Sequence, residues 1–250
     1  MSQEFPTDRD PSPLRRAFDS PEAKRRYVRR LFTTIAGRYD LITRLLSFGR
    51  DQRWKGRVLE FAGPAPGQRV LDLACGTGDL AFGAAACGAE VVGLDLVPRM
   101  IELARARHVT RPEGVNIVWA VGDMTCLPIG SATVDVVTTG YGLRNVPNLA
   151  VALDEIWRVL KPGGRLCSLD FNRPEAAWLR AVYLTYLSLV GGALGWILHG
   201  DPDTYRYIPA SIRRHPGARA ICDLLRSCGF SDVRHVPVLG GLMAIHVARR

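Results

Sequence analysis

From residue 69 to residue 170 the chain alternates between short apolar runs and longer stretches in which apolar residues recur at helical spacing. Short apolar runs that end in turn signals are typical of buried parallel strands. Regular alternation of strands and helices predicts an α/β fold, here a Rossmann-like, mostly parallel sheet with helices on both faces. The predicted strands are 69–73, 90–94, 116–121, 134–138 and 165–170, and the predicted helices begin near Thr77 and cover 98–107 and 148–160.

The pattern is interrupted over residues 171–215 and resumes with two apolar strands at 233–239 and 242–248. A glycine pair between these strands predicts a tight turn, so we expect an antiparallel edge pair that completes a seven-stranded sheet. The interruption contains 181–198, a segment without any charged residue. It is barely long enough to span a bilayer and its glycines weaken a helix, so we interpret 171–215 as a helical lid over an apolar substrate.

The most specific local pattern is VLDLACGTGDL at Val70–Leu80. It predicts a buried strand that ends near Asp72 and turns sharply at Gly76 and Gly78, where a Cβ would block a ligand against the backbone. Asp95 ends the next predicted strand, where an acid can hold ribose hydroxyls. In an open parallel sheet the ligand lies outside the carboxyl ends of the strands. These residues therefore predict a site for a cofactor that contains a nucleoside.

The charges and the glycine spacing of this turn indicate which kind of nucleoside cofactor the site binds. A dinucleotide-binding turn has a third glycine where this chain has Leu80. Asp72 and Asp79 would repel a pyrophosphate but suit a cationic amino-acid group. S-adenosylmethionine has a ribose, an ammonium and a sulfonium and no phosphate, and the turn resembles motif I of class I methyltransferases that use it. The alternative is a glycine turn that only joins a strand to a helix.

Composition adds a question about partners. The chain has 250 residues and a formal net charge of +9, with many of its arginines and lysines in the first 55 positions. Apolar residues interleave with these charges at helical spacing, as in a helix that lies on an anionic membrane or binds nucleic acid, or in a helix with a solvated basic face. The 6 cysteines form no C-x-x-C pair, which predicts reduced thiols, a cytoplasmic protein and no metal site.

Several further segments together resemble the quinone-biosynthesis C-methyltransferases, which act on demethylmenaquinol and polyprenyl benzoquinol. The resemblance runs from about residue 28 to the C-terminus and includes the generic K-P-G-G turn. Two positions depart from the family pattern, because Ile42 and Thr43 stand where Met-Asn is usual. The segments are Tyr39–Gly49, Trp54-Lys55, Gly142–Val146, Arg158–Gly164, Asp203–Tyr207 and Ser211–Pro216.

The composition of the N-terminal segment predicts a disordered leader at 1–20 and basic helices at 21–60, and we expect a methyltransferase domain at 61–250. The resemblance implies S-adenosylmethionine as the cofactor and a lipophilic quinol as the acceptor. Tyr39 either touches the cofactor or fastens the N-terminal helices to the core, and these alternatives stay open. The cofactor contacts that the resemblance implies are Thr77, Asp95, Leu96, Asp123, Met124 and Gly140, the last through its backbone because the usual serine is absent.

Ring methylation requires a nucleophilic carbon, which a quinol acquires when its hydroxyl ionises. Arg144, in the turn after the fourth strand, is the first candidate to stabilise that phenolate. Asn145 is the candidate to orient the ring oxygen. Tyr205 and His215 are second candidates, with His215 as a base near neutral pH. Each has a plainer reading: Arg144 pairs with Asp154 or Glu155, His215 shapes a turn before a proline, and Tyr205 packs in the lid.

Three functions remain open at this point: a quinol C-methyltransferase, a methyltransferase of the same fold with another lipophilic or aromatic acceptor, and a non-catalytic or RNA-binding module. The uncharged segment 181–198 beside the expected site argues against nucleic acid. We expect the protein to contact the inner face of the membrane through its basic N-terminal helices. A homodimer is left open.

Overall fold

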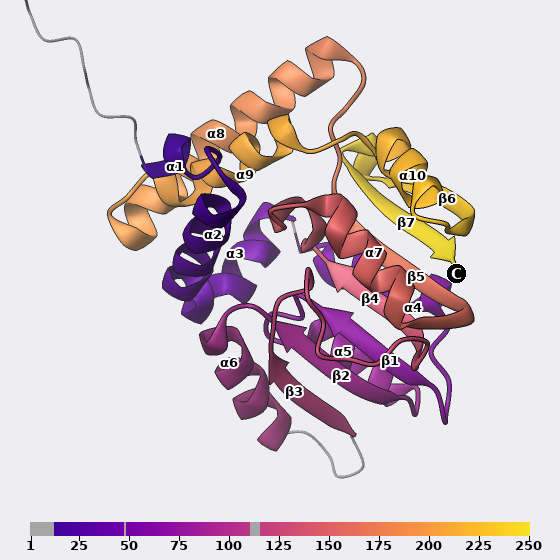
Figure 1. Cartoon of the computed structure of the whole chain (residues 1–250). Coiled ribbons are helices and arrows are strands. Elements are labelled where there is room, and N and C mark those ends of the chain that lie inside the picture. Colours follow the sequence, from indigo (N-terminus) through magenta and orange to yellow (C-terminus); the bar gives the residue numbers. More distant parts are fainter. Residues whose placement is uncertain (1–12, 48, 111–115) are drawn as a thin grey trace, which may run out of the picture.

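The computed structural model describes residues 13–47, 49–110 and 116–250. Its centre is a seven-stranded sheet with strand order β3-β2-β1-β4-β5-β7-β6 (Figure 1). The first five strands are parallel and β7 is antiparallel to both of its neighbours. The predicted α/β sheet and its antiparallel C-terminal pair are therefore confirmed.

Ten α-helices and three short 3-10 helices accompany the strands in the described residues. The elements are α1 Pro13–Arg16, α2 Pro21–Ile35, η1 Ala36–Arg38, α3 Tyr39–Leu46, α4 Asp51–Ala62, β1 Arg69–Leu73, α5 Asp79–Ala86, β2 Glu90–Asp95, α6 Pro98–Val109, β3 Ile117–Val121, β4 Val134–Gly140, η2 Leu143–Asn145, α7 Leu149–Val159, β5 Leu160–Phe171, α8 Ala177–His199, α9 Asp203–Arg214, α10 Ala218–Ser227, β6 Ser231–Val238, η3 Leu239–Gly241 and β7 Met243–Arg249.

Alternating side chains of the strands build two cores, one on each face of the sheet. Val70 of β1 faces α4 and α5, while Leu71 and Leu73 face α7 and α10. All of these residues are buried, as expected for a parallel sheet covered on both faces. This double coverage explains why the strands read as continuous apolar runs, without strict alternation of apolar and polar residues.

The N-terminal helices and the lid form a third apolar cluster beyond the sheet. Val28, Leu31 and Ile35 of α2 pack with Tyr205 and Tyr207 of α9. Helix α8 lies along α9 on the outer side of this cluster, and both are far from the sheet centre in Figure 1. Within the segment 171–215, α8 and α9 form a two-helix layer over this cluster.

Three boundaries differ from the prediction. Strand β5 begins at Leu160, not at Arg165, because Leu160 already pairs with Val134 before the register shifts around the K-P-G-G segment. Helix α4 belongs to the sheet core, since Trp54 and its apolar neighbours pack on α5 and the strands. The predicted leader is shorter, because Pro13–Arg16 form α1; its residues 1–12 lie outside the described part.

One helix in the described part of the chain, α8, is long and apolar enough to cross a membrane by length and composition alone. In the structure one side of α8 is packed against protein, and 33% of its most apolar window is buried. Glycines make that packing close. A Cβ on Gly191 would lie 3.2 Å from Tyr205, and one on Gly195 would lie 2.5 Å from the carbonyl oxygen of Asp201.

We expect Gly195→Ala to lower the free energy of unfolding by about 1–3 kcal/mol, because the new methyl group meets backbone that cannot move aside. Gly56→Ala is the matched control, since nothing lies within 4 Å of that position in α4. It should stabilise the protein by about 0.5–1 kcal/mol through higher helix propensity. Urea unfolding followed by circular dichroism measures both, and equal midpoints would contradict the close α8–α9 packing.

Candidate active site

The turn after β1 is held by the carboxylate that ends β2. Gly76 has a positive φ of 54°, and its N–H donates to Asp95 Oδ2 at 2.8 Å. Asp95 Oδ1 accepts from the N–H of Val97 at 2.9 Å. Burial raises the pKa of Asp95 to about 6. The acid predicted to hold a ribose thus also shapes the glycine turn beside it.

A cavity of about 70 Å³ opens at the ends of β1, β2 and β4, and we call it the strand-end cavity. Asp95 and Gly76 lie in its wall, and so does Asp123, which forms an ion pair with Arg25 of α2 at 3.0 Å. Because Val28 and Phe32 also line it, α2 covers this cavity. Further predicted residues in its wall are Leu96, Met124, Gly140 and Asn145.

A smaller cavity of about 20 Å³, the charged cavity, lies on the other side of the glycine turn. Its wall contains Asp72, Thr77, Asp79 and Lys55. Asp72 accepts from the N–H of Ala81 at 3.1 Å and from the Thr138 hydroxyl at 2.8 Å, and burial raises its pKa to about 7. The wall thus offers carboxylates and one ammonium group side by side.

Asp79 and Lys55 form the ionised pair of the charged cavity. Lys55 Nζ lies 2.7 Å from Asp79 and 3.2 Å from Asp51. Burial opposes the ionisation of Asp79, but Lys55 and then Arg107, at 2.8 Å, hold its pKa well below the usual range. Sequence reasoning did not select Lys55 for the site, although it belongs to the Trp54-Lys55 segment of the resemblance.

Glycine occurs at positions 76 and 78 of the turn for two different structural reasons. Gly76 lies in the cavity wall, with Tyr39 3.6 Å from where a Cβ would be. Gly78 is not among the residues that line either cavity. A Cβ there would lie 2.5 Å from the Trp119 ring, and φ is 92°. Packing against β3 and the start of α5 requires this glycine.

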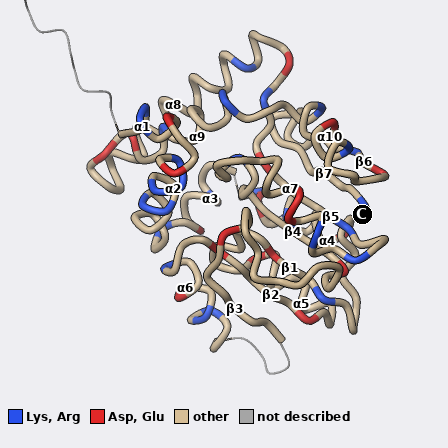
Figure 2. The backbone as a smooth tube through the Cα atoms, in the orientation of Figure 1, with Lys and Arg blue, Asp and Glu red and all other residues tan. Residues whose placement is uncertain are grey.

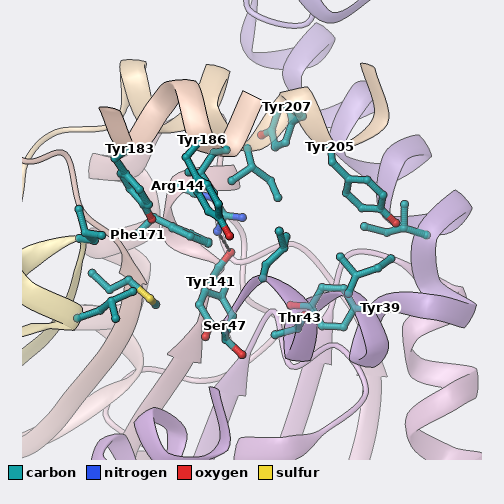
Figure 3. A pocket seen from close by; sticks show the side chains of 18 of the residues that line it. Tyr39, Thr43, Ser47, Tyr141, Arg144, Phe171, Tyr183, Tyr186, Tyr205 and Tyr207 are labelled. Atoms are coloured by element: carbon teal, nitrogen blue, oxygen red, sulfur yellow. Dashed lines mark hydrogen bonds between the residues drawn. The ribbon is translucent and has the colours of Figure 1, made fainter. Parts of the chain in front are cut away.

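An apolar cavity of about 400 Å³ lies between the N-terminal helices and the lid. Side chains of α2, α3, α8 and α9 form most of its wall, and Figure 3 shows tyrosines from several of these elements around it. The labelled wall residues are Tyr39, Thr43, Ser47, Tyr141, Arg144, Phe171, Tyr183, Tyr186, Tyr205 and Tyr207.

Two tyrosines line all three cavities, so they form the partition between them. Tyr39 begins α3, and Tyr141 follows β4. Tyr141 has a positive φ of 62° and is buried. A bulky residue in this conformation is strained and marks a constrained functional turn. Sequence reasoning left the role of Tyr39 undecided and did not select Tyr141. The signal that could have identified Tyr141 is its position directly before the G-L-R-N segment.

Arg144 is the only charged side chain among the described residues that line the apolar cavity. Its guanidinium donates to Asp170 at 2.9 Å and to the Tyr141 carbonyl oxygen at 2.9 Å, and it lies over the Phe171 ring. The guanidinium Nε is buried and has no hydrogen-bond partner. Arg144 therefore has a fixed orientation and a donor to spare.

The plainer alternative for Arg144, an ion pair with Asp154 or Glu155, does not form, but a pair with another carboxylate does. Glu155 binds Arg158 at 2.7 Å, and Asp170 at the end of β5 holds Arg144. Asn145 also differs from its expected place beside the acceptor. It lines the strand-end cavity, and its side-chain N–H donates to the Tyr141 carbonyl oxygen at 2.8 Å.

Tyr205 and His215 have different positions relative to the apolar cavity. Tyr205 lines it, but its hydroxyl is bonded to His199 at 2.9 Å. His215 is buried and is not among the residues that line the cavity. Burial lowers its pKa, so the imidazole is neutral at pH 7. Of the residues the structure describes, no cluster of three or more His, Cys, Asp or Glu has the arrangement of a metal site.

The sequence profile of the ubiE/COQ5 methyltransferase family matches residues 20–250. The chain belongs to this family. It is 39% identical over 246 residues to the ubiquinone/menaquinone biosynthesis C-methyltransferase UbiE of Rubrivivax gelatinosus, covering 96% of this chain and 95% of that one. It is 41% identical over 222 residues to the demethylmenaquinone methyltransferase of Thermus thermophilus, covering 88% of this chain and 100% of that one.

Solved structures share the fold of this methyltransferase at low identity. A methyltransferase of Thermotoga maritima, described as dependent on S-adenosylmethionine, is 18% identical with a TM-score of 0.60 and covers 88% of this chain and 98% of its own. The phosphoethanolamine N-methyltransferase 2 of Haemonchus contortus, solved with S-adenosyl-L-methionine, is 17% identical with a TM-score of 0.59, covering 79% and 52%. The family and the fold together make this chain a methyltransferase of the class I architecture.

The raised pKa of Asp72 gives a pH dependence with a defined sign. Its folded-state pKa of about 7 exceeds the ordinary value of 3.8 for an aspartate, so the stability that Asp72 contributes is present below pH 4 and is lost as pH rises towards 7. Relative to the Asp72→Asn variant, the ligand-free protein should lose up to about 1.4 kcal/mol per pH unit in this window. Urea unfolding at several pH values measures the difference, and parallel curves would show that the carboxyl titrates normally.

Proposed function

We propose that this methyltransferase transfers a methyl group from S-adenosylmethionine to a ring carbon of a lipophilic quinol in menaquinone or ubiquinone biosynthesis. One observation carries the proposal: an apolar cavity with a single charged side chain, Arg144, adjoins the carboxylate-lined cavities across Tyr39 and Tyr141. The names of the relatives, which are quinone-biosynthesis C-methyltransferases, point to the same chemistry.

The two cavities at the strand ends suit the parts of S-adenosylmethionine. Asp95 and Asp123 offer carboxylate oxygens to ribose and adenine donors in the strand-end cavity. Asp72 and Lys55 offer opposite charges to the ammonium and carboxylate of the methionine end in the charged cavity. When bound, this cofactor supplies a methyl group on a positively charged sulfur. The faces of Tyr39 and Tyr141 favour a cation at the partition.

Arg144 is the residue that activates the acceptor in this proposal. A quinol hydroxyl that reaches the guanidinium of Arg144 is stabilised as its phenolate, and the ring carbon beside it becomes nucleophilic. Asp170 positions the guanidinium and does not touch the acceptor. Burial raises the pKa of Tyr183 and of Tyr207 well above the usual value for a tyrosine. These tyrosines stay protonated and serve as hydrogen-bond donors to the ring oxygens.

A second acceptor class has a specific observation in its favour. Ile42 and Thr43, which depart from the family pattern, both line the apolar cavity. They change its shape on the α3 side, so a different lipophilic aromatic is the alternative acceptor. Comparing methyl transfer into demethylmenaquinol, a polyprenyl benzoquinol and a plain polyprenyl phenol separates the two proposals.

The decisive experiment follows labelled methyl groups from S-adenosylmethionine into extracted membrane lipids. Label in a quinone fraction supports the proposed reaction. Label only in soluble metabolites or RNA would overturn it. We also propose that the enzyme works in the cytoplasm at the inner face of the membrane, with its basic N-terminal helices towards the lipid.

Asp95→Ala should weaken binding of S-adenosylhomocysteine by about 2 kcal/mol, because it removes the ribose acceptor and releases the Gly76 turn. Isothermal titration calorimetry measures the affinity. Asp135→Ala is the matched control, since Asp135 pairs with Lys161 away from these cavities. Unchanged affinity in Asp95→Ala would place the cofactor elsewhere.

Arg144→Lys should reduce kcat about 100-fold while the affinity for S-adenosylhomocysteine stays within about twofold, because the charge beside Asp170 is kept and the donor towards the acceptor is lost. Steady-state methylation of a short-tailed quinol measures kcat, and calorimetry measures the affinity. If both fall together, Arg144 has an architectural role. A kcat close to that of the original protein would remove it from the chemistry.

A further inference from the structure

The outer side of α8 is an exposed apolar stripe. Its exposed side chains include Trp178 at 72%, Leu189 and Trp196 at 69%, Ile197 at 68% and Val182 at 63%. An exposed apolar area of this kind marks an interaction surface more often than a free one. We call these five residues and Tyr186, which is 37% exposed, the α8 stripe.

The α8 stripe faces outward because the opposite side of the helix packs against the rest of the protein. Tyr183, Leu184 and Leu187 are buried, and the glycines that follow them meet α9. The exposed positions 178, 182, 186, 189 and 196 recur at helical spacing along the opposite, outer side of α8. No Lys, Arg, Asp or Glu occurs between Arg180 and Asp201, and α8 is tan along most of its length in Figure 2.

The stripe is continuous with the wall of the apolar cavity. Val182 and Tyr186 are exposed at the surface and also line the cavity. On α3, which forms another part of the wall, Leu41 and Leu45 are 49% and 51% exposed. An apolar molecule that lies along α8 therefore reaches the cavity without crossing a polar surface.

Positive charge flanks the same surface. The Arg38 guanidinium donates to the carbonyl oxygen of Leu198 at the C-terminal end of α8. Arg30 of α2 lines a neighbouring cavity together with His199, and α2 carries several Lys and Arg residues in Figure 2. Two acids, Asp201 and Asp203, line the same neighbouring cavity, and Asp203 is paired with Arg206 at 3.2 Å. The surroundings of the stripe suit anionic headgroups.

We propose that the α8 stripe is a docking surface for an anionic lipid bilayer, in which α8 lies in the plane of the interface. Trp178, Tyr186 and Trp196 are placed along it as aromatic residues are in interfacial anchors. The helix does not span the bilayer in this arrangement, because its other side stays packed on α9. The inference rests on the proposed function, since a lipophilic acceptor then enters the cavity from the acyl-chain region.

The test compares vesicle binding of the full chain and of Leu189→Glu/Trp196→Glu, a variant that changes the stripe without touching the cavity wall. Vesicles of phosphatidylcholine with 30% phosphatidylglycerol and vesicles of phosphatidylcholine alone are the probes. We expect the partition coefficient on anionic vesicles to fall roughly tenfold or more in the variant, because both apolar contacts are lost and negative charge is added.

The matched control is Val109→Glu/Val118→Glu, which adds the same charge at exposed apolar positions of α6 and β3. It should lower binding less than about threefold, since only long-range charge attraction changes. Equal losses in the two double variants would overturn the proposal. So would binding by the unaltered protein that is the same with and without anionic lipid, or absent from both.

Fluorescence and oligomeric state give independent readouts. Trp178 and Trp196 are exposed, whereas Trp54 and Trp119 are buried, so vesicles should shift tryptophan emission to the blue and brominated lipids should quench it. Trp178→Phe/Trp196→Phe should lose most of that change. If sedimentation instead shows a dimer that Leu189→Glu/Trp196→Glu dissociates, while vesicle binding is unchanged, the stripe is an interface between two copies.

Methylation of two different quinols tests the docking surface separately from the proposed function. Leu189→Glu/Trp196→Glu should methylate a water-soluble, short-tailed quinol at the rate of the unaltered protein, but a long-chain quinol in vesicles at about a tenth of that rate or less. If neither protein methylates either quinol, the proposed function fails while the vesicle-binding result still stands on its own. Equal rates on the long-chain quinol would contradict the docking surface alone.

Discussion

The buried ion pair between Arg144 and Asp170 connects the sheet, the turn beside it and the N-terminal cover. Asp170 at the end of β5 accepts from the guanidinium and also from the backbone N–H of Arg144 at 3.0 Å. The carbonyl oxygen of Arg144 in turn accepts from Lys24 of α2 at 3.0 Å. Because an unpaired buried charge is costly, these groups hold one another in place. The strained turn at Tyr141 and the wall of the apolar cavity depend on this arrangement.

The N-terminal segment has a more specific role than its charge suggests. Lys24 and Arg25 fasten α2 over the strand-end cavity, through backbone carbonyls of the turn after β4 and through Asp123. Lys55, which looks like one more basic residue of the same segment, is buried between Asp51 and Asp79. Part of the formal charge excess is thus used inside the molecule, to position a cover and to build a cavity wall.

The sequence allowed prediction of what depends on strand topology. Parallel strands bring their carboxyl ends to one edge, so Asp72, Asp95 and Asp123 could be placed together from spacing alone. The bounds of β1 to β4 and of α6 and α7 followed from apolar periodicity to within about two residues. The early start of β5 did not, because the K-P-G-G segment after Leu160 indicates a turn before the strand, whereas Leu160 already pairs with β4.

Contacts between distant segments could not be predicted. Asp170, the partner of Arg144, lies 26 positions further along the chain on β5. Asp154 and Glu155 are carboxylates nearer to Arg144 in the sequence. His215 looked suitable by chemistry and by its family segment, yet chain direction after α9 buries it away from the cavity wall. The strain at Tyr141 is a backbone property that residue type does not reveal.

The shared tyrosine partition restricts how such an enzyme can diversify. Tyr39 and Tyr141 belong to every one of the three cavities, so altering either one disturbs methyl donor and methyl acceptor simultaneously. Ile42, Thr43 and the α8 side chains in the wall of the apolar cavity line neither the strand-end cavity nor the charged cavity. Lineages that acquire new acceptors are therefore free to vary there, while the partition itself stays under double selection.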